Sequence, residues 1–228
     1  SGTRMVKMQH PDLEVYSSGV HAYRSVACAD CHMPYRTEGG VKFSSHHVAS
    51  PLLDVSTSCG VCHRWSEAEV ESRVEAMQGK QWALRLQAED ALARAHFDVA
   101  AAKEAGAGDE ELAGARDLVR RAQMRWDYVS ANNGMGFHSP AECLLVLATA
   151  IDLAQEARLL ATRILAVHGV TGSPVYPDVS TRQKALEVIT AFEKAAADPA
   201  MKPPSLLPEG GADEHVGRIL NALADQNV

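Results

Sequence analysis

Two copies of one pattern, Cys-x-x-Cys-His, constrain this chain more than any other feature. They occupy residues 28–32 and 59–63. In proteins that carry covalent haem, the two thiols of this pattern form thioethers with the haem vinyl groups, and the histidine ligates the iron. The sequence therefore predicts two haem c groups. Their attachment residues are Cys28, Cys31 and His32 for one, and Cys59, Cys62 and His63 for the other.

Two other uses of paired cysteines explain the pattern less well. Two Cys-x-x-Cys pairs suit zinc knuckles, but zinc coordination does not account for a histidine in the same register after both pairs. A thioredoxin-like redox pair needs a surrounding βαβ pattern, which is absent from both motifs. The fifth cysteine, Cys143, falls on an apolar segment, and we interpret it as a small core residue.

Histidines outside the two motifs are candidates for the second axial ligand that a six-coordinate haem iron requires. His21 lies just before the first motif, His46 and His47 follow two serines, and His138 precedes a helix start. Each is either a ligand or an ordinary surface or capping histidine. The full set is His10, His21, His46, His47, His96, His138, His168 and His215.

The chain changes character near residue 65, so we expect two segments, 1–64 and 65–228. The first holds both motifs, many turn-forming residues and poor periodicity, so it cannot easily build its own core and should wrap around a bound group. The second has helical periodicity, and no period-2 strand pattern stands out anywhere. We therefore predict a mainly α multihaem cytochrome c fold, with a loop-rich haem-wrapping segment followed by long helices.

Helix boundaries in the second segment are set by capping residues. Ser66 and Glu69 form a capping box, and Ser139-Pro140-Ala141-Glu142 is typical of a helix start. The helix that begins there is apolar nearly all round, so we expect it to be buried. The predicted helices run from 66 to the glycines at 106 and 108, from 109 to about 131, from 139 to about 167, from 181 to 197, and from 212 to 225.

Composition narrows the functional class. The net charge of -7 argues weakly against nucleic acid as a partner. The aromatic content of 5% is low, so something other than aromatic side chains fills part of the interior. Charged residues interrupt the longest apolar stretch, 141–170, so we expect no membrane span. The first residues lack the features of a signal peptide, so we expect the mature protein, or a fragment of it, to begin here.

The chain resembles the C-terminal half of cytochrome c nitrite reductase, the ammonia-forming pentahaem enzyme. The order and spacing of several segments carry the resemblance over nearly all of the sequence. These are Lys7-Met8-Gln9-His10-Pro11, Gly19-Val20-His21, Cys28-Ala29-Asp30-Cys31-His32-Met33-Pro34, His46 with Ser50-Pro51, residues 59–63, Ala95-His96-Phe97, Arg125-Trp126-Asp127 and His138-Ser139-Pro140-Ala141-Glu142.

The resemblance implies roles for individual residues. The motif of residues 28–32 would hold the fourth haem of the family and that of residues 59–63 the fifth. His138 would be the distal ligand of the fourth haem, His21 that of the fifth and His46 that of the second. His10 would be the active-site histidine. Lys7, through its backbone carbonyl, and Gln9, through its side chain, would bind calcium, for which oxygen donors are suited.

The resemblance also implies an activity and partners. The family reduces nitrite to ammonium with six electrons in the periplasm, and nitrite binds through its nitrogen to a lysine-ligated haem. Electrons come from a multihaem quinol dehydrogenase or a soluble cytochrome, and the long helices form a homodimer. The lysine-type motif of the catalytic haem is absent from these residues, so we expect a fragment or one subunit of a split enzyme, completed by an N-terminal half or companion chain.

Three rival interpretations remain open. A non-catalytic multihaem electron-transfer cytochrome would also keep its haems six-coordinate. A related multihaem enzyme, acting on hydroxylamine or being an octahaem nitrite reductase, would differ in haem count. A helical protein with zinc knuckles would contain no haem at all.

The sequence assigns no role to His47.

Overall fold

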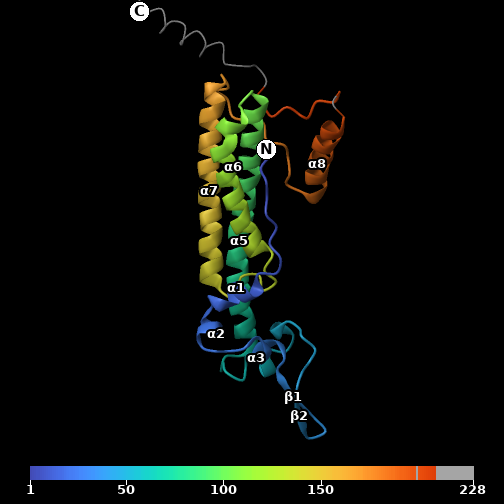
Figure 1. Ribbon diagram of the computed structural model, residues 1–228. Helices are drawn as coiled ribbons and strands as arrows, with labels where there is room; N and C mark the ends of the chain where they lie inside the picture. Colours follow the sequence, from blue (N-terminus) through green and yellow to red (C-terminus); the bar gives the residue numbers. More distant parts are fainter. Residues whose placement is uncertain (199, 209–228) are drawn as a thin grey trace, which may run out of the picture. The chain divides into compact units, whose positions relative to one another are not determined.

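The computed structural model describes residues 1–198 and 200–208 and is mainly helical. Short elements come first, and long helices follow (Figure 1). The elements are α1 (Asp12–Ser17), α2 (Val20–Tyr23), α3 (Cys28–His32), β1 (Tyr35–Glu38), β2 (Val41–Ser44), η1 (Pro51–Leu53), α4 (Val55–Ser58), α5 (Glu67–Glu104), α6 (Asp109–Ser130), α7 (Pro140–Val167) and α8 (Arg182–Ala197). The predicted fold class is therefore confirmed.

The helix boundaries follow the capping residues of the sequence. The hydroxyl of Ser66 accepts a hydrogen bond from the backbone N–H of Glu69, 3.3 Å away, which starts α5. Gly106, with φ +106°, ends the same helix. The hydroxyl of Thr181 accepts from the backbone N–H of Lys184 and starts α8. The helix predicted at 212–225 lies outside the described residues.

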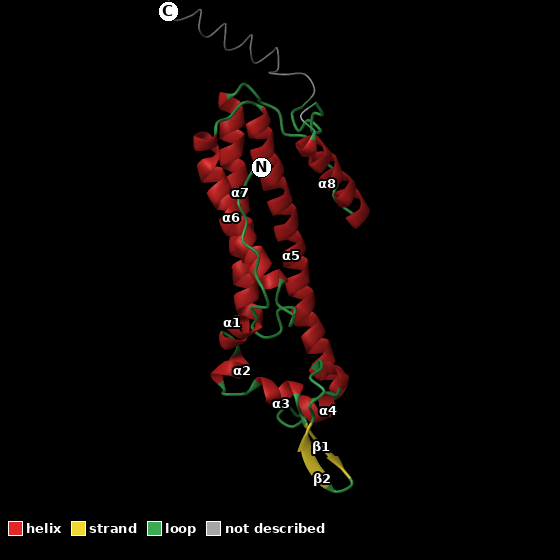
Figure 2. Cartoon of the chain, turned by 45° about the vertical axis from the view of Figure 1, so that its right-hand side comes forward, coloured by secondary structure: helices red, strands yellow, loops and turns green. Residues whose placement is uncertain are grey.

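A two-stranded antiparallel hairpin is present, although no strand pattern stands out in the sequence. Tyr35 pairs with Ser44 and Glu38 with Val41, and Gly39 and Gly40 form the turn between them (Figure 2). Both glycines have positive φ, which the two-residue hairpin turn requires. Neither strand has a buried residue, so the alternation of polar and apolar residues that identifies a half-buried strand is missing.

The chain divides into two compact units. The first consists of Ser1–Val6, Glu89–Gln123 and the described residues from Ala150 onward, and the second of Lys7–Ala88 and Met124–Thr149. Each of the long helices α5, α6 and α7 has one part in the first unit and another part in the second. The predicted division into a haem-wrapping segment, 1–64, and a helical segment with the ligand His138, 65–228, stays a prediction.

The first unit has a core of small and aliphatic side chains. Parts of α5, α6 and α7 lie side by side here (Figures 1 and 2). Alanines on their facing sides allow close approach of the helices, and larger residues such as Leu112, Val119 and Leu165 fill the remaining space. This dense packing agrees with the periodicity from which α5 and α6 were predicted.

A buried carboxylate ties the loop after α7 to this core. Asp98 on α5 is 2% exposed. It accepts hydrogen bonds from the Tyr176 hydroxyl at 2.6 Å and the Arg158 guanidinium at 2.9 Å. Burying a carboxylate is tolerated when charged and polar donors surround it, so the three side chains hold residues near 176 against α5 and α7.

Residues 7–64 of the second unit have a much thinner core than the long helices. The buried aliphatic side chains of residues 7–64 are Val15 and Val55. The rest of this segment consists of single helical turns, a hairpin and loops. A segment with so little apolar burial cannot offset its own conformational entropy. This agrees with the expectation that it wraps around a bound group.

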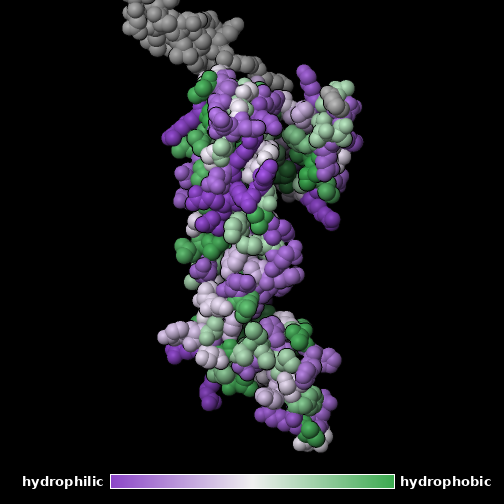
Figure 3. All heavy atoms as spheres, viewed as in Figure 1, coloured by the Kyte–Doolittle hydropathy of each residue, from purple (hydrophilic) through white to green (hydrophobic). Residues whose placement is uncertain are grey.

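Helix α7 is not buried all round, which corrects the expectation from its composition. One stripe, including Cys143, Leu147 and Ala154, is buried. Leu145 is 64% exposed and Leu159 is 53% exposed. Figure 3 shows hydrophobic side chains exposed among hydrophilic ones on the face in view. No helix among residues 1–198 and 200–208 is long and apolar enough to cross a bilayer.

His96 makes the stability of the first unit depend on pH. Burial lowers the pKa of its imidazole to about 4, whereas an unfolded histidine has a pKa of about 6.5. Between these values the unfolded state binds the proton and the folded state does not. The free energy of unfolding should therefore be highest above pH 6.5 and fall, by about 3 kcal/mol at most, as the pH decreases to 4.

Urea unfolding between pH 7 and 4 measures this dependence, and His96→Gln should flatten it. His168→Gln is the control, since His168 is bonded to Glu111 at 3.1 Å on the surface. Equal slopes for His96→Gln and the unaltered chain would contradict the prediction.

Candidate haem-binding site

The first Cys-x-x-Cys-His motif forms one helical turn, α3. The carboxylate of Asp30 accepts a hydrogen bond from the backbone N–H of Ala27 at 2.7 Å, which fixes the start of the turn. The imidazole Nδ1 of His32 lies 2.8 Å from the carbonyl oxygen of Ala49. Since a carbonyl only accepts, Nδ1 carries the hydrogen and Nε2 is free to bind a metal.

The second motif follows α4 directly. The backbone N–H of His63 donates to the carbonyl of Cys59 at 2.9 Å, so the motif folds into a turn like that of α3. Gly60 is required here, because a Cβ at this position would lie 2.5 Å from the carbonyl oxygen of Ser56. The indole of Trp65 stacks on the imidazole of His63. All five cysteines carry free thiols, so those of both motifs are available for thioethers.

The structure brings each motif histidine together with one histidine from elsewhere in the sequence. The ring centroids of His21 and His63 are 6.2 Å apart, and those of His32 and His138 are 6.3 Å apart. A metal–imidazole bond is about 2 Å long, and the ring centroid lies about 1 Å behind the nitrogen, so two imidazoles on opposite sides of one iron have centroids about 6 Å apart. Both separations fit a haem iron between the rings.

Zinc fits this arrangement less well. A structural zinc ion needs four ligands, whereas the motif histidines meet their partners in pairs. Across the part of the chain that is described, no three His, Cys, Asp or Glu side chains gather closely enough to hold a metal ion. Two imidazoles are, by contrast, the full axial ligand set of one haem, whose remaining four iron bonds go to the porphyrin itself.

Two glycines make room for His138. A Cβ on Gly134 would lie 2.7 Å from the Nδ1 atom of the His138 ring, and a Cβ on Gly19 would lie 2.0 Å from the His138 carbonyl oxygen. The ring of Tyr16 meets the imidazole edge-on, with the centroids 5.9 Å apart. The backbone and ring of His138 are therefore confined from several sides, and its orientation toward His32 is set by packing.

Asp12 organises the turn that carries His138. Its carboxylate accepts hydrogen bonds from the side-chain amides of Asn132 and Asn133, at 2.9 and 3.0 Å, and from the backbone N–H of Asn133. It also lies 3.7 Å from Nδ1 of His138. At this distance Asp12 makes no hydrogen bond to the imidazole, whose buried Nδ1 has no hydrogen-bond partner, so Asp12 acts on His138 by fixing the turn that carries it.

Burial keeps the partner histidines neutral. It lowers the pKa of His21 and of His138, and a histidine must be neutral to ligate iron. Burial also raises the pKa of the Cys31 thiol, and the nearby Cys59 adds to this effect.

His10 lies on an exposed loop that is anchored on both sides. Before it, the backbone N–H of Met8 and the ammonium of Lys7 both donate to the carboxylate of Asp127, which is 1% exposed. After it, Asp12 makes the bonds described above. The side-chain amide of Asn133 lies 3.4 Å from Nδ1 of His10 and donates to it, which leaves the hydrogen on Nε2. His10 therefore presents an N–H group toward solvent.

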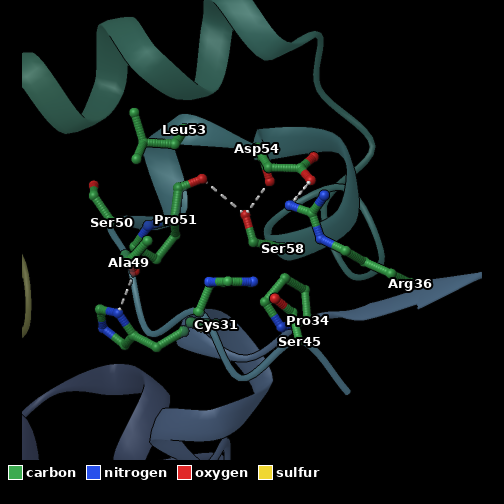
Figure 4. A pocket seen from close by; sticks show the side chains of 12 residues that line it. Cys31, Pro34, Arg36, Ser45, Ala49, Ser50, Pro51, Leu53, Asp54 and Ser58 are labelled. Carbon is green, nitrogen blue, oxygen red and sulfur yellow. Dashed lines mark hydrogen bonds and ion pairs between the residues drawn. The ribbon is translucent and has the colours of Figure 1, made fainter. Parts of the chain in front are cut away.

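The remaining predicted site residues are exposed. Nδ1 of His46 is 2.9 Å from the carbonyl of Ser44, so its Nε2 is free, and no partner histidine meets it among the residues described. Gln9 is exposed beside Lys7. His47 lines a small pocket with Cys31 and Arg36. Figure 4 shows Arg36 of this pocket directed toward Asp54, with which it forms an ion pair at 2.8 Å. The ligand roles of His46, Lys7 and Gln9 stay predictions.

Sequence reasoning missed several residues that shape the site. Asp12, Gly134 and Trp65 act through the ligands that they contact, and nothing in their spacing reveals those contacts. The carbonyl of Ala49 could not be found at all, since every residue carries one. A glycine shortly after a predicted helix, such as Gly134, is typical of a helix end, but that pattern does not indicate the contact with His138.

Known proteins similar to this chain are haem proteins. The family model described as cytochrome c552 matches residues 1–213. Cytochrome c-552 of Bacteroides fragilis ATCC 25285 is 43% identical over 212 residues, covering 92% of this chain and 43% of the relative. Cytochrome c-552 of Bacteroides thetaiotaomicron is 42% identical over 205 residues, covering 89% and 42%. The chain thus spans about two fifths of the length of these relatives.

A solved structure shares the fold. The cytochrome c nitrite reductase of Desulfovibrio desulfuricans ATCC 27774 superposes with a TM-score of 0.67 at 40% identity, covering 71% of this chain and 35% of that one. The catalytic subunit of that enzyme has two calcium sites.

The close approach of Gly134 to His138 gives a test of the ligand pair. Gly134→Ala places a methyl group against the imidazole and should displace it, which would convert the haem predicted at residues 28–32 from low to high spin. Electron paramagnetic resonance (EPR) spectra of the haem-loaded protein measure this change. Gly79→Ala is the control, because a Cβ there meets nothing within 4 Å. A fully low-spin Gly134→Ala protein would contradict the proposed ligation by His138.

Proposed function

The chain belongs to the cytochrome c552 family, and we propose from this that it forms the C-terminal part of a periplasmic, ammonia-forming cytochrome c nitrite reductase. In this proposal it holds two electron-relaying haems and the active-site histidine. The observation that carries the proposal is the pairing of His21 with His63 and of His32 with His138, at separations that fit one iron each.

The two histidine pairs favour electron transfer at the haems held here. Bound haem supplies one-electron redox chemistry. With the two histidines of a pair on either side of it, each haem would have no position left for a substrate, so these residues would suit a relay. The imidazoles are held by the carbonyl of Ala49, by packing around His138 and by the stack on Trp65, which would limit rearrangement when an electron arrives.

Nitrite reduction would take place where His10 faces a haem supplied by residues outside this sequence, either an N-terminal half or a companion chain. The conversion of nitrite to ammonium takes six electrons and eight protons and releases two water molecules. The N–H group on Nε2 of His10 can donate a hydrogen bond to a nitrite oxygen, and a histidine can pass on protons near neutral pH. The anchors at Asp127 and Asp12 hold the loop in place.

Calcium would bind beside this loop. The side chain of Lys7 is engaged by Asp127, which fixes the neighbouring backbone. The carbonyl of Lys7 and the amide oxygen of Gln9 are hard donors of the kind that calcium prefers, and calcium takes six to eight of them. The remaining oxygens would have to come from water or from residues outside this sequence. Removal of calcium by a chelator should weaken nitrite binding, and an unchanged Michaelis constant would contradict this role.

Electron donors and dimerisation complete the proposal. The haems would receive electrons from a multihaem quinol dehydrogenase or a soluble cytochrome. Leu145 and Leu159 of α7 are exposed apolar side chains, and a second copy could cover them. Sedimentation equilibrium of the haem-loaded protein should find a dimer, and monomers at all concentrations would contradict it.

A non-catalytic electron-transfer cytochrome is the second candidate. The same two histidine pairs favour this candidate, since both axial positions of each haem would be occupied. Nitrite turnover by the complete protein separates the two candidates.

The role of His10 can be tested by substitution in the complete, haem-loaded protein. His10→Ala should decrease kcat/KM for nitrite by about 10²–10⁴-fold, the usual contribution of a proton-transferring side chain, while the haem content stays the same. His168→Gln, in the first unit, should have no effect. Unchanged turnover in His10→Ala would exclude the proposed role.

A further inference from the structure

Trp65 is an exposed aromatic residue in an unusual position. It lies two residues after His63, and 46% of it is exposed to solvent. Its ring is nearly parallel to the His63 imidazole, with an angle of 7° between the planes and 5.1 Å between the centroids. This is offset stacking, which stabilises aromatic pairs by about 0.5–1.5 kcal/mol.

Helix α5 holds this indole in place. Trp65 immediately precedes Ser66, which caps the helix. The guanidinium of Arg73 lies over the indole, 4.1 Å from the ring centroid. Arg73 is itself bonded to Glu69 at 3.0 Å. The rotamer of Trp65 is thus fixed by the first two turns of α5, and the charge of the cation above it is balanced by a carboxylate.

We propose that Trp65 is a positioning residue for the axial ligand His63, and that it lowers the midpoint potential of the haem attached at Cys59 and Cys62. The inference rests on the proposed ligation of that haem by His63. A parallel indole restricts rotation of the imidazole about the iron–nitrogen bond. Its electron-rich face also stabilises positive charge on the ligand, which is greater in the ferric than in the ferrous state.

The orientation of His63 matters because of the ligand that faces it. The planes of His21 and His63 are 86° apart. The EPR spectrum of a low-spin ferric haem depends on the angle between its two axial imidazole planes, and nearly perpendicular planes give a large maximal g value. Loss of the stack would let His63 rotate, so the g value would fall or the signal would broaden.

The chain provides a matched control. Trp82, on α5, is 43% exposed, and the guanidinium of Arg85 lies 4.0 Å from its ring centroid. It shares exposure and cation contact with Trp65. The ring contact that distinguishes Trp65 is the one with His63.

The experiment is an EPR-monitored redox titration of the haem-loaded, full-length protein and of its Trp65→Leu, Trp65→Phe and Trp82→Leu variants. His21→Met changes the opposite ligand of the same haem and so identifies its signal. In Trp65→Leu, the ferric-to-ferrous ratio of this haem at a fixed applied potential should fall about two- to fivefold, and its signal should change. Trp65→Phe, which keeps a ring, should give an intermediate result, and Trp82→Leu none.

Several results would overturn the inference. One is an unchanged potential and spectrum in Trp65→Leu, and another is an equal shift in Trp82→Leu. Failure of the proposed function would give another result. The haem attached at Cys59 and Cys62 would then be absent, or its EPR signal would not respond to His21→Met.

Discussion

The separation between facing imidazoles is the constraint on which the second unit depends. Each pair leaves room for one iron and for little else, so two residues far apart in sequence must be held within a narrow range of distance. His21 and His63 come from a short helix and a turn, and His32 and His138 from α3 and the turn before α7. Several residues around the pairs limit where the ligands or their backbone can lie. These are Gly19, Gly134, Asp12 and Ala49.

The two units are stabilised by different kinds of packing. In the first, long helices pack through alanines and aliphatic side chains, and a buried Asp98 bonds to the loop after α7. In the second, residues 7–64 bury very little apolar surface of their own. Covalently attached haem would supply the missing interior there, since a porphyrin buries a large apolar area. The low aromatic content of the chain agrees with this division.

The sequence predicted the long helices well, because their capping residues and periodicity are local. It failed for the hairpin, whose strands have no buried face and hence no alternation. It failed for the exposed side of α7, because composition shows how apolar a helix is but not what covers it. The ligand pairs came from a family resemblance, not from spacing. The contacts of Trp65 and Asp12 depend on tertiary structure, so no local pattern could have indicated them.

The central claim is that each histidine pair holds one covalent haem. The most direct test counts haems on this polypeptide, by pyridine haemochrome absorbance together with intact mass. The account predicts two haems per chain, each retained under denaturing conditions because thioethers attach it. A chain that carries one haem or none after expression with a functional haem-attachment system would contradict it, and the zinc interpretation would then have to be tested with the metal itself.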